Sequence, residues 1–334
     1  MKNPVQIGHP FKRGECVFPV VRGYLSQTVV KARYDDGSCK HAIFNFIFDS
    51  VSGERKPLEI VQGTAPTTSA GMTLAQMAAM LPPVAVEFWN ANFSQLLTTQ
   101  TLQELMLPAH ITTHLSGPIA TDIEVTDKTE AHHIRFNGST AQYDPAGNAC
   151  IKLVWNLTFY PTVNKIRMRL RIENSNIRAL QETVYATRVL VDGVKVAEHP
   201  WDIHSRNRVW RPFRIPGETM GEYWIGGAPA QLSINPNLKH IASTKAFPNY
   251  DTSFQVSPTA ITAMLTKYAS ARRSWMRNVR DLSNCGFWNT AMSAAGTRAD
   301  FGPAMAWVIM WLYSGNRNLF NLCVEESIRF SIQD

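Results

Sequence analysis

The chain has 334 residues, of which 45% are hydrophobic and 18% are charged, and it carries a formal net charge of +7. This length allows a large buried core, and the ordinary balance of apolar and charged residues is that of a globular protein and does not favour an intrinsically disordered chain. The positive charge favours an anionic partner. No lysine- or arginine-rich block resembles a nucleic-acid-binding tail, however, so nucleic acid is not the expected partner.

The cysteines and the apolar stretches give expectations about location. The five cysteines are widely spaced and include no Cys-x-x-Cys pair, which disfavours a disulfide framework or a zinc site and favours a reducing compartment. The first residues lack the apolar run of a signal peptide, and the longest apolar stretch, 302–313, is too short to span a bilayer. We therefore expect a protein that is made in the cytoplasm without a signal peptide or membrane span. If it works outside the cell, we expect it to leave within a virus particle.

Strands are expected to dominate residues 1–65, an N-terminal β-hairpin region. Residues 28–33 and 41–48 are rich in β-branched and aromatic side chains, which favour strands. The segment between them contains Asp-Asp-Gly at 35–37, where glycine supplies the positive φ of a tight turn. The pattern predicts a hairpin.

Residues 66–115 are expected to form a connector with short helices. Thr73 is a candidate N-cap for a helix that ends at Leu81, directly before two prolines. A weaker helical pattern covers residues 98–107.

Residues 116–255 show the period of two that is typical of strands, and we predict an antiparallel β-sandwich or barrel there. Strands are expected at 151–159 and 165–172, and the second alternates so that its apolar residues share one face. Another hairpin is expected over 183–196, with its turn at the Asp-Gly pair 192–193.

Residues 256–334 predict α-helices. Ser257 and the proline after it are typical of a helix start, and two further helices are expected over 301–313 and 316–330, the first closed by Gly315. Such a pair of helices cannot bury both apolar stripes unaided, so we expect them to pack on other elements or on another subunit. The predicted fold class is mainly β, with antiparallel sandwich or barrel domains followed by a short α-helical C-terminal segment.

Several segments carry a family resemblance. Residues 7–15 and 30–42 are similar to the N-terminal β domain of exo-rhamnogalacturonan-lyase-like proteins, also called RIFT-barrel-related, and shorter similar stretches lie at 116–118, 201–211, 246–251 and 296–303. The resemblance implies β domains followed by an α/α toroid that acts on acidic polysaccharide, and relatives encoded by phages and prophages. The predicted helices are too few for a complete toroid, so an active site built across one would lack most of its walls.

A lyase acting on a uronic acid needs a base for the proton beside the carboxylate and a cation to neutralise that carboxylate. His204 and Tyr250 are the candidate bases. Arginine grips a carboxylate in a fork and tryptophan stacks on a sugar, so the candidate ligand-binding residues are Arg206, Arg208, Trp210, Arg211, Asp251 and Arg298. The alternative, which we favour, is a polar loop whose arginines pair with local acids and whose tryptophans are buried.

The predicted strand 165–172 gives the clearest electrostatic pattern. Its alternate residues Lys165, Arg167, Arg169 and Arg171 would lie in a row about 7 Å apart and serve as an interface to a polyanion or an acidic partner. The alternative is a solvated sheet face with cross-strand acids, for which Glu182 is a candidate.

Other site patterns are absent from the sequence. There is no Walker loop, no G-x-G-x-x-G, no H-E-x-x-H and no G-x-S-x-G, so no cofactor is expected. His132 and His133 are adjacent and would face opposite sides of a strand, so no metal site is expected either.

These patterns favour a non-catalytic structural or adhesion protein of a phage-type virus particle, built on a carbohydrate-enzyme-like β scaffold and involved in host attachment. The expected partners are other virion proteins or further copies of the chain, with a host surface glycan such as an acidic polysaccharide. The alternative is a polysaccharide lyase or hydrolase that acts on acidic glycan.

Overall fold

A computed structural model of the protein describes residues 2–49, 55–64, 70–174, 182–204, 208–210, 213, 222–230, 232–246, 251–277 and 304–330. For residues 200–203, 208–210, 271–277, 325 and 327–330 it describes the backbone alone. The fold is mainly β, with 41% strand and 22% helix, antiparallel sheets, and helices that lie mostly late in the chain. The predicted fold class is confirmed.

The chain divides into two compact units. One consists of Met1–Thr67 and Ala230–Ser331, and the other contains Thr68–Pro229. The N-terminal strands and the late helices therefore belong to the same unit, and the sandwich is inserted between them in the sequence. The expected connector over 66–115 differs from the structure, because three of its segments are strands of the sandwich.

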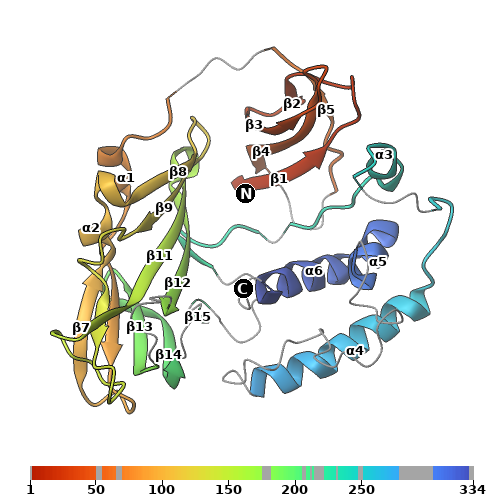
Figure 1. Ribbon diagram of the computed structural model, residues 1–334. Helices are drawn as coiled ribbons and strands as arrows, with labels where there is room; N and C mark the ends of the chain where they lie inside the picture. The colour runs from red at the N-terminus through yellow and green to blue at the C-terminus, as the bar shows by residue number, and fades with distance from the viewer. Residues whose placement is uncertain are drawn as a thin grey trace. The chain divides into compact units, whose positions relative to one another are not determined.

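The first unit begins with five short and medium strands. A three-stranded antiparallel sheet has the order β1-β4-β3, and β2 pairs with β5 (Figure 1). Their bounds are β1 (Lys2–Pro10), β2 (Pro19–Val21), β3 (Ser26–Arg33), β4 (Cys39–Asp49) and β5 (Ile60–Gln62). The predicted hairpin is confirmed as β3 and β4. In its turn Gly37 has a φ of +81°, which a side chain would strain. Alternate residues of β4, among them Phe44, Phe46 and Phe48, fill the core of this sheet.

Four helices of the first unit are described, namely α3 (Leu238–Ser243), α4 (Pro258–Arg277), α5 (Ala306–Ser314) and α6 (Arg317–Phe330). The backbone amide of Ala260 donates to the Ser257 hydroxyl at 3.1 Å, which confirms the predicted N-cap of α4. Gly315, with a φ of +61°, ends α5 as predicted. The apolar sides of α4, α5 and α6 meet around Tyr268, Trp307 and Leu319, so these helices bury their stripes against one another.

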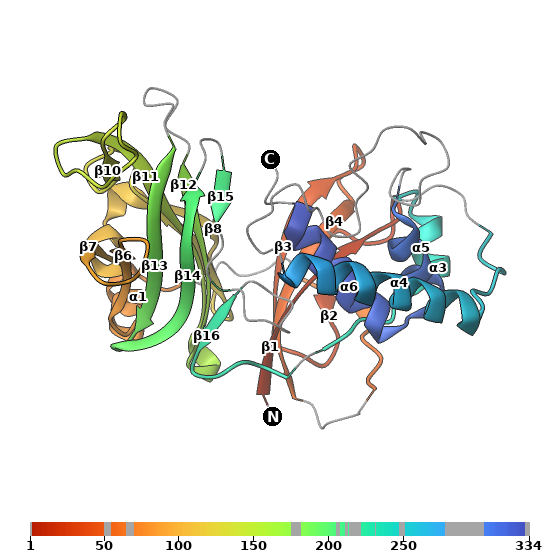
Figure 2. The same ribbon diagram turned by 90° about the horizontal axis from the view of Figure 1, so that it is seen from below.

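The second unit is a β-sandwich of two antiparallel sheets (Figures 1 and 2). One sheet has the order β15-β12-β11-β9-β8, with β10 beside β11 and β16 beside β12, and the other has the order β14-β13-β6-β7. The strands are β6 (Val84–Trp89), β7 (Leu96–Thr101), β8 (Ile111–Leu115), β9 (Thr121–Thr126), β10 (Ile134–Phe136), β11 (Asn148–Tyr160), β12 (Lys165–Asn174), β13 (Thr183–Val191), β14 (Val194–His204), β15 (Arg208–Trp210) and β16 (Tyr223–Ile225).

Short helical turns connect the strands of the sandwich. They are α1 (Leu74–Met80), α2 (Leu102–Leu105), η1 (Pro108–His110) and η2 (Pro161–Val163). The predicted helix after Thr73 is confirmed, with Thr73 and Gln76 forming a capping box. The helical pattern over 98–107 is only partly helical, because β7 extends to Thr101 and the helix is confined to α2.

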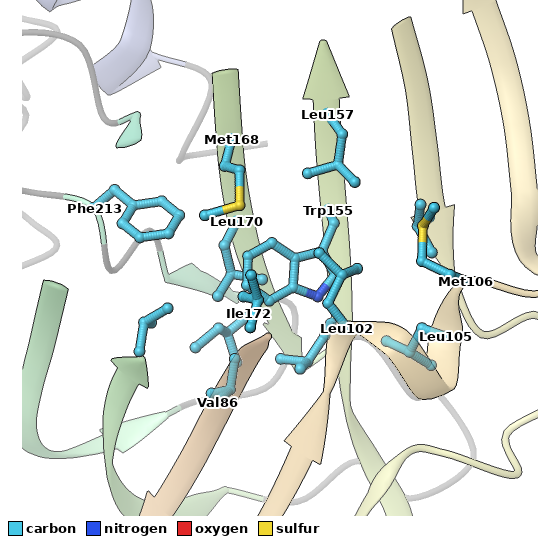
Figure 3. Packing of buried hydrophobic residues seen from close by; sticks show 14 of the residues in the cluster. Val86, Leu102, Leu105, Met106, Trp155, Leu157, Met168, Leu170, Ile172 and Phe213 are labelled. Atoms are coloured by element: carbon cyan, nitrogen blue, oxygen red, sulfur yellow. The ribbon is translucent and has the colours of Figure 1, made fainter. Parts of the chain in front are cut away.

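The core of the sandwich lies between the two sheets, around Trp155 on β11. Figure 3 shows the indole surrounded by Leu170 of β12, Val86 of β6 and Leu102 of α2. Trp155 is fully buried, and its ring centroid lies 6.4 Å from that of Phe213. Residues of both sheets and of the short helix therefore pack into one buried core that includes Trp155.

None of the helices in the described ranges is long and apolar enough to cross a membrane.

Candidate functional site

Among the described residues, the most extensive cluster of charged side chains lies on the side of the seven-stranded sheet that faces away from the core. β12 alternates buried apolar residues with basic ones, and its neighbours add acidic and polar residues on the same side. We call this surface the polar face. It consists of Asp122, Glu124, Lys152, Asn156, Thr158, Lys165, Arg167, Arg169, Arg171, Glu173, Glu222 and Trp224.

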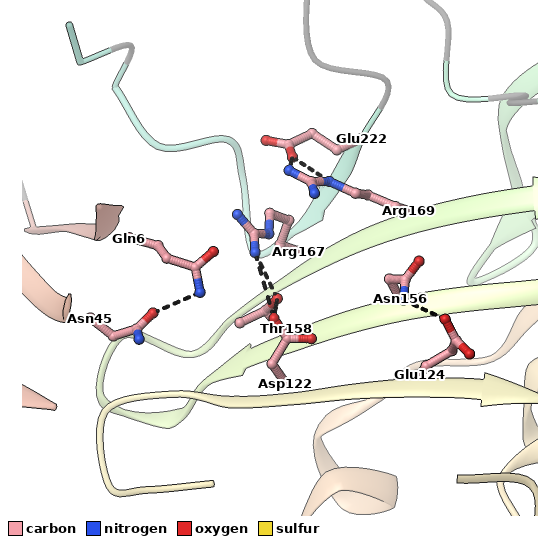
Figure 4. A network of polar contacts seen from close by, with 9 residues as sticks. All are labelled: Gln6, Asn45, Asp122, Glu124, Asn156, Thr158, Arg167, Arg169 and Glu222. Carbon is pink, nitrogen blue, oxygen red and sulfur yellow. Dashed lines mark hydrogen bonds and ion pairs between the residues drawn. The ribbon is translucent and has the colours of Figure 1, made fainter. Parts of the chain in front are cut away.

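The first row of the polar face crosses three strands. Asp122 of β9, Thr158 of β11 and Arg167 of β12 lie opposite one another in the sheet register. The Arg167 guanidinium donates to the Thr158 hydroxyl at 3.0 Å, and that hydroxyl donates to the Asp122 carboxylate at 3.2 Å (Figure 4). Burial raises the pKa of Asp122, although Arg167 and the bond from Thr158 oppose that rise.

The second group centres on Glu222, directly before β16. Arg169 donates to one Glu222 oxygen from Nε at 3.1 Å and from Nη2 at 2.9 Å (Figure 4). The other Glu222 oxygen accepts a bond from Trp224 Nε1 at 2.9 Å. The Trp224 ring also stacks on Tyr160, with centroids 5.9 Å apart and planes 22° from parallel. The indole is therefore held by contacts on its edge and on one ring face.

The third group centres on Glu124 of β9 and Glu173 of β12. Arg171 Nη2 donates to the Glu124 carboxylate at 3.2 Å, and Arg171 Nε lies 3.5 Å from Glu173. Asn156 also donates to Glu124, at 3.3 Å, and Lys152 Nζ lies 3.1 Å from Glu173. Each carboxylate here therefore has more than one polar partner.

All four cations predicted to form an interface have partners within the chain. Lys165 Nζ donates to the Gly226 carbonyl at 2.9 Å, and the three arginines make the contacts described above. The acids that pair with them come from β9, from β12 itself and from the segment before β16, and they do not include Glu182. The pairing by cross-strand acids that we weighed as the alternative is thus present, while binding of an outside partner stays a prediction.

His204, a predicted base, is at the end of β14 and is fully buried. Its Nδ1 lies 2.5 Å from the Tyr185 hydroxyl, and its carbonyl accepts a bond from Asn174 at 2.8 Å. Tyr185 is also fully buried, and burial raises its pKa well above the ordinary value. A base with no exposed surface cannot reach a polysaccharide in this conformation, so the position of His204 is that of a core residue.

The other predicted residues of the loop cluster are only partly covered by the structure. Tyr250, Arg206, Arg211 and Arg298 lie outside the described residues. Arg208 and Trp210 belong to β15, whose backbone pairs with β12 so that they lie opposite Asn174 and Ile172, respectively. Their assignment as ligand-binding residues stays a prediction.

Asp251, a predicted ligand-binding residue, is exposed and stabilises a turn. Its carboxylate accepts bonds from the Ser253 hydroxyl at 2.6 Å and from the Ser253 amide at 2.9 Å. These two bonds lower the pKa of Asp251. The observed contacts of this carboxylate are therefore those of a turn residue.

The sequence pattern did not reveal a second polar cluster, around Asp127. This buried carboxylate accepts bonds from the Thr129 hydroxyl at 2.6 Å and the His132 amide at 2.6 Å, and it lies 3.3 Å from His110 Nε2. Burial acts to raise the pKa of Asp127, but the hydrogen bonds outweigh it and hold the pKa at about 2. Within the described ranges, no three His, Cys, Asp or Glu side chains are grouped so that they could hold a metal ion.

No family model matches the chain, and comparison with curated proteins and with solved structures gave no match either. The resemblance to exo-rhamnogalacturonan-lyase-like proteins is therefore a prediction that rests on the sequence segments alone.

Proposed function

We propose that the protein is a virion-associated adhesion protein of phage type that binds a host surface glycan on its polar face without cleaving it. The observation that supports the proposal is the polar face itself, where arginine–carboxylate pairs on hydrogen-bonded strands lie beside an indole whose orientation is set by its contacts. Sugars offer hydroxyl groups that both donate and accept hydrogen bonds, and C–H faces that pack on aromatic rings. The polar face presents complementary groups of each kind.

The support beneath this face favours binding by a preorganised surface. β12 pairs with β11 over its whole length, from Asn174 opposite Ile151 to Lys165 opposite Tyr160. Their inner sides carry Trp155, Leu157, Met168 and other buried residues of the sandwich core. A surface built on paired strands loses little conformational freedom when a ligand binds, which favours affinity.

The virion part of the proposal is supported by the sequence resemblance to a family whose relatives include proteins encoded by phages and prophages. Native mass spectrometry of the full chain tests it: we expect a complex of several copies, or a stable complex when genomically neighbouring particle proteins are added. A strict monomer that binds none of these proteins would contradict a structural role in a particle.

The glycan part is tested by a glycan array with the full chain and two variants. Arg169→Gln removes a charge from the polar face, and Arg188→Gln removes a comparable one from the other sheet, where Arg188 lies 2.8 Å from Glu198. We expect the wild type and Arg188→Gln to bind the same glycans and Arg169→Gln to bind them at least about tenfold more weakly, since charge-assisted bonds are worth about 1.5–3 kcal/mol. Equal binding by all three would exclude the polar face, and no binding by the wild type to any glycan would refute adhesion.

A second candidate function, cleavage of an acidic glycan, is favoured by one observation. Asp122 is a desolvated carboxylate with a raised pKa that lies 3.9 Å from the Arg167 guanidinium, a base and a cation side by side. Incubation with uronate polysaccharides should then produce ultraviolet absorbance from an unsaturated uronate, and Asp122→Asn should abolish it. Absence of that product across a broad panel, with folded protein, would remove the lyase candidate.

A further inference from the structure

We infer that the ligand of the polar face is an uncharged, hydroxyl-rich sugar, and not the acidic polysaccharide that the net charge of the chain suggests. The inference rests on the proposed function, because it assigns a ligand class to the same surface. Two observations support it: the small net charge of the polar face, and the ion pairs that its charged side chains already form with one another.

The polar face is nearly neutral. It holds five cations and four carboxylates, which leaves a net charge of +1, against +7 for the whole chain. Strong binding of a polyanion depends on cations that are not yet compensated, because the gain comes from neutralising them. The excess positive charge of the protein therefore lies outside the polar face.

The ion pairs of individual residues also disfavour an anionic ligand. The Arg169 guanidinium already directs two N–H groups at one Glu222 oxygen, at 3.1 and 2.9 Å. A ligand carboxylate that took over these donors would leave Glu222 without its cation and would lie beside it with the same charge. Both consequences cost free energy, since the Glu222 side chain is only 8% exposed and an unpaired carboxylate there is poorly solvated, and since like charges repel.

A hydroxyl group can bind to the same pairs without breaking them. Arginine has five N–H donors, and each carboxylate oxygen accepts more than one bond, so a paired guanidinium and carboxylate keep donors and acceptors for a neutral ligand. The Arg169 side chain is 43% exposed and that of Arg171 is 31% exposed, so both present their outer edges to solvent. One sugar hydroxyl can accept from such a guanidinium while it donates to the neighbouring carboxylate.

Trp224 adds an apolar surface in a fixed position. It lies opposite Arg167 in the sheet register and so shares the side of the sheet that carries the arginines. Its bond to Glu222 and its stack on Tyr160 set the orientation of the ring. Sugars in general pack C–H groups on such rings, and this contact needs no charge on the ligand.

Isothermal titration of the full chain with two probes at low and high salt tests the inference. The probes are a neutral oligosaccharide mixture from dextran and galactan, and oligogalacturonate. We expect binding of the neutral probe with an affinity that changes less than about threefold with salt, because no counterions are released. Glu222→Gln and Trp224→Ala should each weaken this binding by about tenfold or more, and Arg188→Gln should leave it unchanged.

Circular dichroism and thermal unfolding of each variant establish that it is folded, and Glu222→Gln keeps the shape of the side chain. Binding of oligogalacturonate alone, with steep salt dependence, would overturn the inference and leave glycan adhesion standing. If all the variants bound the neutral oligosaccharide as well as the wild type does, the binding site would lie outside the polar face, and the inference would again be wrong. No binding to either probe, together with an empty glycan array, would refute the proposed function itself.

Discussion

Trp155 is the largest fully buried side chain in the core of the sandwich. The sequence predicted the strand that carries it, since residues 151–159 are rich in β-formers, but it did not predict that this residue centres the core. Its indole N–H has no hydrogen-bond partner among the described residues. Packing, and not polar bonding, therefore accounts for its contribution to stability.

Trp155→Ala should lower the free energy of unfolding of the sandwich by about 3–5 kcal/mol, because it leaves a large cavity between the sheets. Trp155→Phe should cost only about 1–2 kcal/mol, since it keeps an aromatic ring and gives up no hydrogen bond. Urea denaturation measures both. Equal losses for the two variants would show that the indole N–H has a partner or that the site collapses around either replacement.

Asp127 is a buried charge whose hydrogen bonds should make a measurable contribution to stability. Asp127→Asn should destabilise the sandwich by about 2–4 kcal/mol at neutral pH, because several donors would lose a charged acceptor. Asp251→Asn is the matched control: that carboxylate accepts bonds from the residue two positions later, as Asp127 does, but it is exposed, so its loss should have a much smaller effect on stability.

The same carboxylate predicts a direction for acid unfolding. The pKa of Asp127 is about 2 in the folded protein against an ordinary 3.8, so its contribution is complete above about pH 4 and is lost as the pH falls toward 2. Stability of the wild type should decline over that range, and Asp127→Asn should show a shallower decline. Parallel pH profiles for the two proteins would contradict this assignment.

Helix ends and turns were predicted correctly where their structure depends only on residues close together in the sequence. The cap at Thr73, the turn at Gly37 and the helix end at Gly315 each follow from residues close in sequence, and each is confirmed. The segment 98–107 was less predictable, because its threonines favour a strand and its leucines a helix, and pairing of β7 with β6 decided between them.

The contact of α3 with β1 depends on a stacked pair of imidazoles. The rings of His9 and His240 lie 4.8 Å apart and 16° from parallel, and His240 Nε2 lies 3.0 Å from the Pro10 carbonyl. Burial lowers the pKa of His9 from 6.5 to about 4; the nearby His240 and His41 lower it further, and Glu15 opposes them. The folded state therefore favours neutral His9.

This pair should weaken as the solution is acidified. Since the pKa of His9 is lower in the folded state, its neutral form contributes fully above about pH 6.5, and the contribution falls as the pH drops toward 4. We expect amide hydrogen exchange in α3 to accelerate over that interval. His9→Phe keeps an aromatic ring against His240 and removes the titrating group, so it should flatten the response. An unchanged pH profile in His9→Phe would assign the effect to another group.

At the scale of the whole molecule, the mainly β architecture with late helices was predictable, because strand periodicity and helix caps are carried by the sequence itself. The division into units was not, since the N-terminal strands and the late helices are far apart in sequence and only tertiary contacts join them. The candidate site was also only partly predictable from the sequence. The alternation of residues on β12 predicted a row of cations. Their acidic partners include residues of β9 and Glu222, and these could not be predicted because alternation within one strand does not give the order of strands in the sheet.

Binding of a glycan to the polar face of the sandwich is tested most directly by the protection of arginine side chains from an arginine-specific dicarbonyl reagent. The protection is measured by mass spectrometry with and without saturating neutral oligosaccharide. Arg169, Arg171 and Arg188 have comparable exposure, at 43%, 31% and 28%, so their reactivities can be compared. We predict that the sugar protects Arg169 and Arg171 and leaves Arg188 unchanged. Equal modification of Arg169 and Arg171 with and without bound sugar would contradict the claim.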